Sequence, residues 1–161
     1  MSLREGVAAI TVIALCAFGI STAIGAKRPV FPGVFAATAT GKKEVSTTTG
    51  KKNAGDQGAR AGFTAVIDGG QLCWAIVAKN VDGTLSGAHI HKGAANVNGP
   101  VVVPLDPPTS GDPGTSSACQ EITAALAAAI TKNPAKHYFN LHSTPSFPGG
   151  AVRGQLSWKT K

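Results

Sequence analysis

The Asp-Gly-Gly triplet at residues 68–70 is the strongest constraint on how this chain can fold. It lies between two runs, residues 61–67 and 71–78, in which apolar side chains recur at every second position. Alternation with a period of two is typical of a strand with one buried face, and glycine readily adopts the positive φ angles that a tight hairpin turn needs. The sequence therefore predicts a β-hairpin, with one apolar face formed by Phe63, Ala65, Ile67, Leu72, Trp74 and Ile76.

The rest of the chain continues this pattern of short strands and turns. One helix is predicted at residues 122–130, because Ile122, Leu126 and Ile130 recur at helical spacing. About seven strands with regular turn signals favour an all-β fold, a single antiparallel immunoglobulin-like or dismutase-like β-sandwich with that one short helix. Further strands are expected at residues 34–40, 88–92, 101–103, 137–142 and 151–158, and loops or turns at 41–58, 80–87, 93–100, 109–117 and 145–150.

The first residues have the pattern of an export signal. Residues 7–26 carry no charge, and small residues occupy the −3 and −1 positions before Ala26. We predict a signal peptide at residues 1–25, with an N-terminal anchor as the alternative, followed by a linker at 26–34 and one domain at 35–158. The mature chain would then be secreted, periplasmic or displayed on the cell surface. It would meet a membrane only if the leader stays uncleaved.

Two cysteines remain after the predicted leader, Cys73 and Cys119. In an exported chain such a pair predicts one disulfide, and two reduced buried thiols are the alternative. The closed loop of about 45 residues would stabilise the fold by roughly 4 kcal/mol through the entropy of the unfolded chain.

The chain has a net charge of +7, and its basic residues are concentrated near the start of the mature domain. Residues 27–60 hold seven lysines and arginines but only two acids, Glu44 and Asp56. Such a segment suits an anionic surface or glycan, although a solvated loop explains it equally well. No aromatic residue lies between Ala36 and Gly62, so stacking on nucleic-acid bases is not expected.

Histidines provide the sharpest chemical signal. His89 and His91 are two residues apart on a predicted strand, so both side chains lie on one face. On a later strand Asn140 and His142 share a face in the same way, whereas the odd offset of His137 turns it to the other side. His89, His91 and His142 thus form a candidate site for copper or zinc, since imidazole suits these ions better than calcium or magnesium. The alternative is that these histidines are purely structural.

Signatures of catalysis are missing from the sequence. There is no Gly-x-Ser-x-Gly elbow, no phosphate-binding loop and no His-Glu-x-x-His motif. The acidic residues lie mostly in or beside turns, where their side chains cap the backbone. We assign no catalytic residue and expect a binding or structural module rather than an enzyme.

Five blocks of the chain form a combined pattern: residues 39–45 (ATGKKEV), 88–95 (AHIHKGAA), 98–105 (NGPVVVPL), 138–143 (YFNLHS) and 147–156 (FPGGAVRGQL). In this order they resemble the CHRD domain, a module first described in chordin. The resemblance covers roughly residues 35–158 and implies an extracellular all-β domain. Many exported bacterial members carry a cysteine pair placed like Cys73 and Cys119. The family supplies no assigned chemistry.

A looser likeness connects the chain with copper-zinc superoxide dismutases, which also carry a His-x-His strand, a later histidine and one disulfide. It implies His89, His91 and His142 as copper ligands and Arg153 as a candidate anion contact. A bridging histidine and a zinc-binding cluster are not found. The expected function is therefore an exported CHRD module of the cell envelope or extracellular space, with an unknown protein or glycan partner and a transition-metal site. The alternatives are a dismutase-like copper enzyme and an adhesion or matrix protein that binds anionic polymers.

Overall fold

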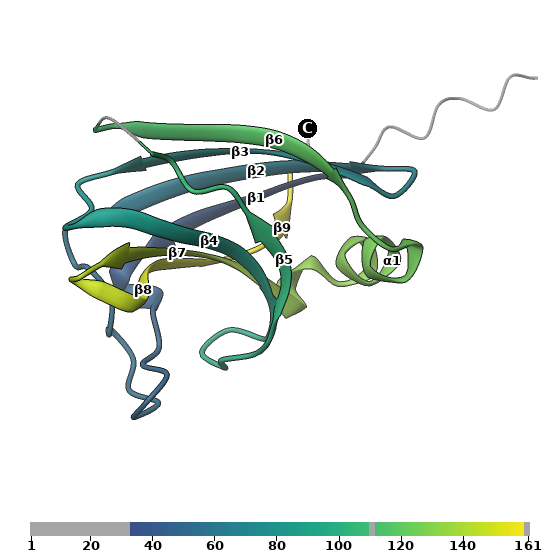
Figure 1. The fold of residues 1–161 in the computed structure, drawn as a ribbon. Coiled ribbons are helices and arrows are strands. Elements are labelled where there is room, and N and C mark those ends of the chain that lie inside the picture. Colours follow the sequence, from purple (N-terminus) through teal and green to yellow (C-terminus); the bar gives the residue numbers. More distant parts are fainter. Residues whose placement is uncertain (1–32, 110–111, 160–161) are drawn as a thin grey trace, which may run out of the picture. The chain divides into compact units, whose positions relative to one another are not determined.

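The computed structural model describes residues 33–109 and 112–159. Within these ranges the chain forms nine strands, one α-helix and two short 3-10 helices (Figure 1). The strands are β1 (Gly33–Thr40), β2 (Arg60–Asp68), β3 (Gln71–Lys79), β4 (Thr84–Lys92), β5 (Val101–Leu105), β6 (Gly114–Glu121), β7 (His137–Thr144), β8 (Phe147–Gln155) and β9 (Ser157–Trp158). The helices are η1 (Gly41–Lys43), α1 (Ala124–Lys132) and η2 (Pro134–Lys136).

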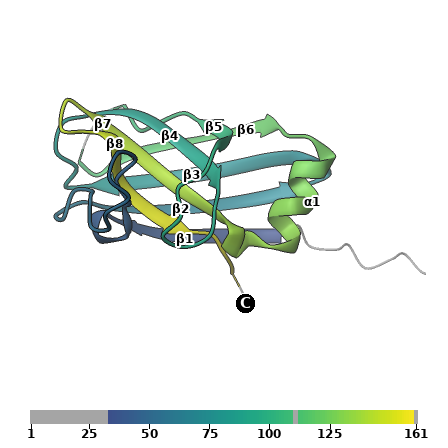
Figure 2. The same cartoon turned by 90° about the horizontal axis from the view of Figure 1, so that it is seen from below.

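All strand pairs are antiparallel, and the sheet runs in the order β5-β4-β7-β8-β1-β2-β3-β6, with β9 beside β1. The sheet curls over on itself, so that β1, β2, β3 and β6 form one layer and β4, β5, β7 and β8 the other (Figures 1 and 2). Strands β1 and β8 connect the layers through one register pair, Thr40 and Arg153. The predicted all-β sandwich with one short helix is confirmed.

The core lies between the layers and is built from the alternating apolar positions. Phe63 of β2 stacks on Phe139 of β7, with ring centroids 4.8 Å apart, and both side chains are at most 1% exposed. The predicted hairpin is present, since Asp68 pairs with Gln71 around Gly69 and Gly70, both at positive φ. Burial of large apolar side chains of this kind contributes about 1.5–3 kcal/mol each.

The helix begins two residues later than predicted. Thr123 caps it, because its hydroxyl oxygen accepts a hydrogen bond from the amide of Leu126 at 3.2 Å. Ile122 therefore remains outside the helix, while Ile130 is buried against the core. The cap residue, rather than the apolar spacing, fixes where this helix starts.

Parts of three predicted loop segments are strands. β4 begins at Thr84, so residues 84–87 of the connector expected at 80–87 belong to it. β6 includes residues 114–117 of the loop expected at 109–117; their Ser- and Thr-rich sequence fits a strand with one exposed face. The turn expected at residues 145–150 is confined to Pro145 and Ser146, and β8 begins at Phe147. Gly150 is needed inside β8 because a Cβ atom there would lie 2.6 Å from an oxygen of Glu44.

The predicted leader at residues 1–25 and residues 26–32 of the predicted linker lie outside the described residues. The last two linker positions, Gly33 and Val34, belong to β1. In the part of the chain that the structure describes, no helix has the length and apolar character needed to cross a bilayer.

Candidate metal site

The three predicted ligands lie together on the outer face of the layer formed by β4 and β7. His89 is paired in register with Asn140, His91 with Tyr138, and Gly87 with His142. Directly opposed residues of neighbouring strands point to the same side of a sheet. Ile90, between the two histidines of β4, is fully buried in the core. The strand alternation predicted for this motif is therefore confirmed.

The geometry of the cluster suits one small ion. His89, His91 and His142 each offer a ring nitrogen, and these three atoms lie within 4.8 Å of one another. The ring of His89 is perpendicular to that of His91 and inclined by 74° to that of His142, with centroids 5.5 Å and 5.1 Å away.

Each of these rings has one buried nitrogen that finds no hydrogen-bond partner among the described residues: Nδ1 of His89, Nε2 of His91 and Nε2 of His142. In two of them the other nitrogen is held by a backbone carbonyl. Nδ1 of His91 lies 2.9 Å from the oxygen of Gly99, and Nδ1 of His142 lies 3.0 Å from that of Pro148. Since a carbonyl only accepts, each Nδ1 carries the proton and each Nε2 keeps its lone pair free, as a metal ligand requires.

Burial favours the neutral form of His89 and His91. It lowers the pKa of His89 to about 4, with a smaller contribution from the charges of His142 and His91. The pKa of His91 is also lowered, again chiefly by burial, although the hydrogen bond to Gly99 opposes the change. Neutral imidazole is the form that binds a metal ion, so the lowered pKa values keep His89 and His91 in the metal-binding form as the pH falls below 6.5.

A buried acid lies beside the cluster. Glu44 is 3% exposed and follows η1. Its Oε2 accepts a hydrogen bond from Nδ2 of Asn140 at 2.6 Å, and its Oε1 accepts one from the amide of Val45 at 3.0 Å. Burial raises the pKa of the Glu44 carboxyl, and these hydrogen bonds partly offset the effect. The sequence did not predict that Glu44 is buried beside the cluster. Glu44 follows two lysines in a polar segment, and such a segment is normally exposed.

Arg153 supports the site through a stack of three side chains. Its Cζ lies 3.4 Å from the centroid of the Tyr138 ring, and the His91 ring stacks on Tyr138 at 4.7 Å. The guanidinium donates hydrogen bonds to the side-chain oxygen of Asn98 and the backbone oxygens of Ala94 and Val97. These bonds fix the loop that carries Gly99. The side chain is 1% exposed, and the anion contact expected for Arg153 stays a prediction.

The fourth histidine is separate. His137 is 2% exposed, and its Nδ1 lies 3.1 Å from the backbone oxygen of Asn133. It is not part of the three-histidine group. Its exclusion agrees with the odd offset from His142 noted in the sequence.

The predicted disulfide is present and lies in the other layer. Cys73 of β3 and Cys119 of β6 are directly opposed in register and bonded to each other. Cys119 is exposed on the outer side of β6. The bridge therefore joins two neighbouring strands far along the sheet from β4 and β7.

Comparison with known proteins shows a family to which the chain is similar. The family model described as the CHRD domain matches residues 35–156, which include every element from β1 to β8 except the first residues of β1. No curated protein matches the chain.

Proposed function

The chain belongs to the CHRD domain family, and we propose that this member is an exported, non-enzymatic binding module that holds one transition-metal ion between His89, His91 and His142. Copper(II) is the first candidate and zinc the second. Export is part of the proposal and is supported by the signal-like pattern at residues 1–25.

The observation that carries the proposal has two parts. His89, His91 and His142 each bring a ring nitrogen to within 4.8 Å of the others, and each keeps one buried ring nitrogen that has no hydrogen-bond partner among the described residues. A buried polar atom that makes no hydrogen bond costs about 1–3 kcal/mol, so three such atoms in one cluster are expensive unless something binds them. A metal ion between the three rings would bind one nitrogen of each. The rigid strands β4 and β7 and the carbonyls of Gly99 and Pro148 hold the rings in place.

The donor set selects the class of metal. Three neutral imidazoles without a carboxylate in the group disfavour calcium and magnesium, which prefer oxygen ligands. Among divalent ions, copper generally binds nitrogen sites more tightly than zinc. Three protein ligands would leave a coordination position open for water or an exogenous ligand.

The test is a calorimetric titration of the full chain with copper(II) and, separately, zinc, combined with electron paramagnetic resonance of the copper form. We expect one equivalent of copper with a nitrogen-rich spectrum. His91→Gln removes a proposed ligand and should weaken binding at least about tenfold, because losing a residue that only supports a ligand already costs about 10–100-fold. His137→Gln is the matched control, because it removes a buried histidine outside the cluster.

Binding that is equally strong in the wild type and in His91→Gln, with both proteins folded by circular dichroism, would overturn the metal site. The dismutase alternative is separated by a superoxide assay on the copper-loaded chain. If the copper-loaded chain removes superoxide no faster than an equal amount of free copper, the domain is a binding module and not a dismutase. Turnover that is abolished in His91→Gln would replace that conclusion with a redox enzyme.

A further inference from the structure

Two cations face each other on the outer side of the other layer. Arg60 of β2 and Lys79 of β3 are directly opposed in register, and both side chains are exposed. Like charges in this position are normally destabilising. The pair therefore concentrates positive charge at a cost in stability that a bound anion would relieve.

A third cation extends the pair across β1. Lys43 of η1 donates a hydrogen bond from Nζ to the backbone oxygen of Thr38 at 2.7 Å, which anchors the side chain over the neighbouring strand. Lys43, Arg60 and Lys79 thus form what we call the basic row, spread over the ends of three adjacent strands. Neighbouring strands lie about 4.8 Å apart, so the row presents its charges at short intervals.

The surface beside the basic row is hollowed. A depression of about 260 Å³ is lined by Thr38, Arg60, Ala61, Gly62, Val77 and Lys79. Gly62 leaves it open, since a Cβ atom at that position would meet nothing within 4 Å. An extended ligand could lie in this depression with its charges against Arg60 and Lys79.

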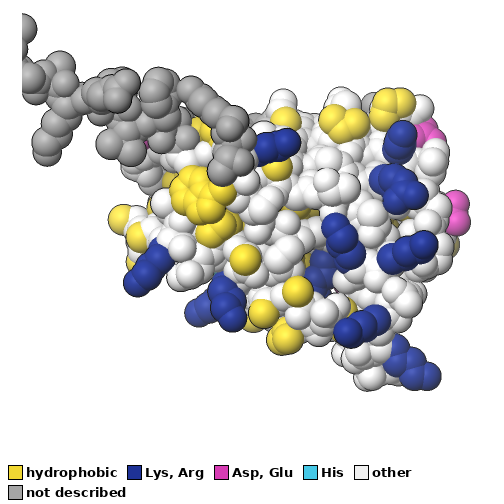
Figure 3. Space-filling model, turned by 180° about the vertical axis from the view of Figure 1, so that it is seen from behind, with side chains coloured by type: hydrophobic (Ala, Val, Ile, Leu, Met, Phe, Trp, Pro, Cys, Tyr) yellow, Lys and Arg dark blue, Asp and Glu magenta, His cyan; other side chains and the backbone are white. Residues whose placement is uncertain are grey.

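Of the acids near the row, two are turned away from the surface, and the exposed Asp112, which lines a hollow together with Lys79, accepts a hydrogen bond from the amide of Asn80. Glu44 and Asp56 are 3% and 5% exposed. The Asp56 carboxylate accepts hydrogen bonds from the amides of Gly58, Ala59 and Asp82, which ties it into the turn before β2. The segment from Lys42 to Arg60 consequently exposes five cations and turns both of its acids inward. Figure 3 shows a face of the molecule on which Lys and Arg side chains clearly outnumber Asp and Glu.

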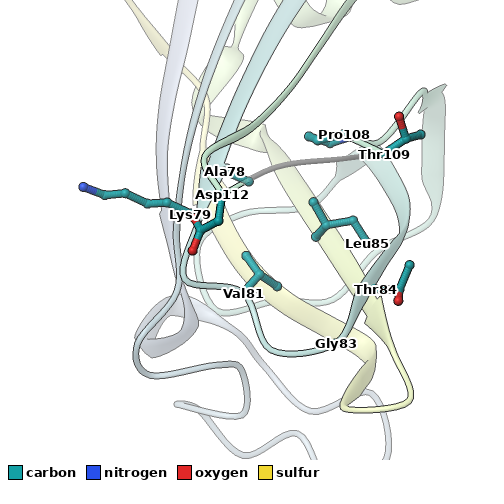
Figure 4. Close-up of a pocket in the computed structure, with 9 residues that line it drawn as sticks. All are labelled: Ala78, Lys79, Val81, Gly83, Thr84, Leu85, Pro108, Thr109 and Asp112. Carbon is teal, nitrogen blue, oxygen red and sulfur yellow. The ribbon is translucent and has the colours of Figure 1, made fainter.

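A projecting loop carries two further cations. The bridge between Val45 and Lys52 and the hydrogen bond from the Ser46 amide to the Lys51 oxygen make residues 45–52 a narrow ribbon. Lys51 and Lys52 are exposed on it. At the other end of the row, Figure 4 shows Lys79 extending away from the hollow that Val81 and Leu85 line, so its charge is directed outside the sandwich.

We propose that the basic row binds an acidic polysaccharide. The ligand is a linear sugar polymer whose carboxylate or sulfate groups contact Lys43, Arg60 and Lys79 in succession. This surface is independent of the proposed metal site.

Among polyanions, the surface favours a polysaccharide over a nucleic acid. No Phe, Trp or Tyr occurs from Ala37 to Gly62, so bases would find no stacking partner on the row or its loop. A membrane surface is also disfavoured, because Val77 is the one large exposed apolar side chain that lines the depression within the described residues. Insertion into a bilayer needs a broader apolar face.

The experiment measures binding of the full chain to heparin, as the sulfated probe, and to polygalacturonate, as the carboxylated probe, at 50 and 200 mM salt. We expect affinity to fall steeply with salt, and Arg60→Gln/Lys79→Gln to weaken binding at least about tenfold and flatten the salt slope by about two counterions. The matched control is Lys132→Gln/Lys136→Gln, which removes two exposed cations from α1 and η2. It should change affinity by less than about threefold if only non-specific charge is lost.

Several outcomes would overturn the proposal. Equal losses in the row variant and the matched control would show that net charge alone drives binding. Tighter binding to single-stranded poly(dT) or to anionic phospholipid vesicles than to both glycans would assign the surface to a different partner. Circular dichroism must show that both double variants remain folded. Because the histidines are untouched in every variant, copper titration of the same proteins reports on the metal site separately.

Discussion

Tyr138 lies between Arg153 and His91, with the guanidinium 3.4 Å from its ring centroid and the imidazole stacked on its other face. This stacking connects β8, which carries Arg153, to the candidate metal ligand His91 of β4. Arg153 also holds the loop whose Gly99 carbonyl fixes the tautomer of His91. One buried cation thus orients the same histidine in two ways, through a ring and through a loop.

Replacing this arginine by lysine should loosen the loop while keeping the charge. Arg153→Lys loses the forked donors that reach Ala94, Val97 and Asn98, and hydrogen bonds to charged groups are worth about 1.5–3 kcal/mol each. We expect the free energy of unfolding to fall by about 2–4 kcal/mol and copper affinity to fall with it. Urea denaturation and copper titration check both. Unchanged stability would show that the loop does not depend on these bonds.

The pH dependence of stability should reflect the lowered pKa values of the histidines. An unfolded histidine takes up a proton near pH 6.5, whereas His89 in the folded chain does so only near pH 4. The metal-free protein should therefore lose stability as the pH falls from about 6.5 toward 4, since the unfolded state binds more protons in that window. Urea midpoints at pH 7.5, 6, 5 and 4 measure the effect. His89→Gln should show a shallower loss over the same range.

Gly150 should tolerate no side chain, unlike its neighbour. A Cβ atom at Gly150 would lie 2.6 Å from Oε2 of Glu44, and the residue has a φ of 133°. Gly150→Ala should destabilise the protein by at least about 1–3 kcal/mol and disturb the contact between Glu44 and Asn140. Gly149→Ala is the control, because its nearest neighbour would be the Thr47 hydroxyl at 3.5 Å. Thermal melts of the two variants should differ clearly.

Removing the disulfide should weaken the fold and spare the candidate metal site. Cys73→Ser/Cys119→Ser opens a loop whose ends are 46 residues apart, which predicts a loss of roughly 4 kcal/mol. Cys73 lies in β3 and Cys119 in β6, whereas the three histidines lie in β4 and β7. Copper affinity measured where the variant is still folded should stay within about twofold of the wild type, since distant sites are usually independent. A large loss of copper binding would show that the two layers are coupled.

Local patterns predicted the fold well where the strands alternate and the turns contain glycine. The hairpin around Gly69 and the His-x-His face of β4 follow from a period of two, a local property of the backbone. The same reasoning failed at residues 114–117, because an edge strand with one exposed face can consist of serine and threonine. It also extended the turn to Gly150. That residue lies inside β8 and is glycine because a Cβ atom there would collide with the Glu44 carboxylate.

The sequence by itself determined the strands, the cysteine pair and which side of its strand each histidine occupies. Only the tertiary structure decided that His142 lies beside His89, that Glu44 and Asp56 turn inward, and that Arg60 faces Lys79. The physical reason is the range of the interactions. Alternation and turn preference act between neighbours in the chain. Register between distant strands and burial under distant loops depend on how the whole sheet curls and packs.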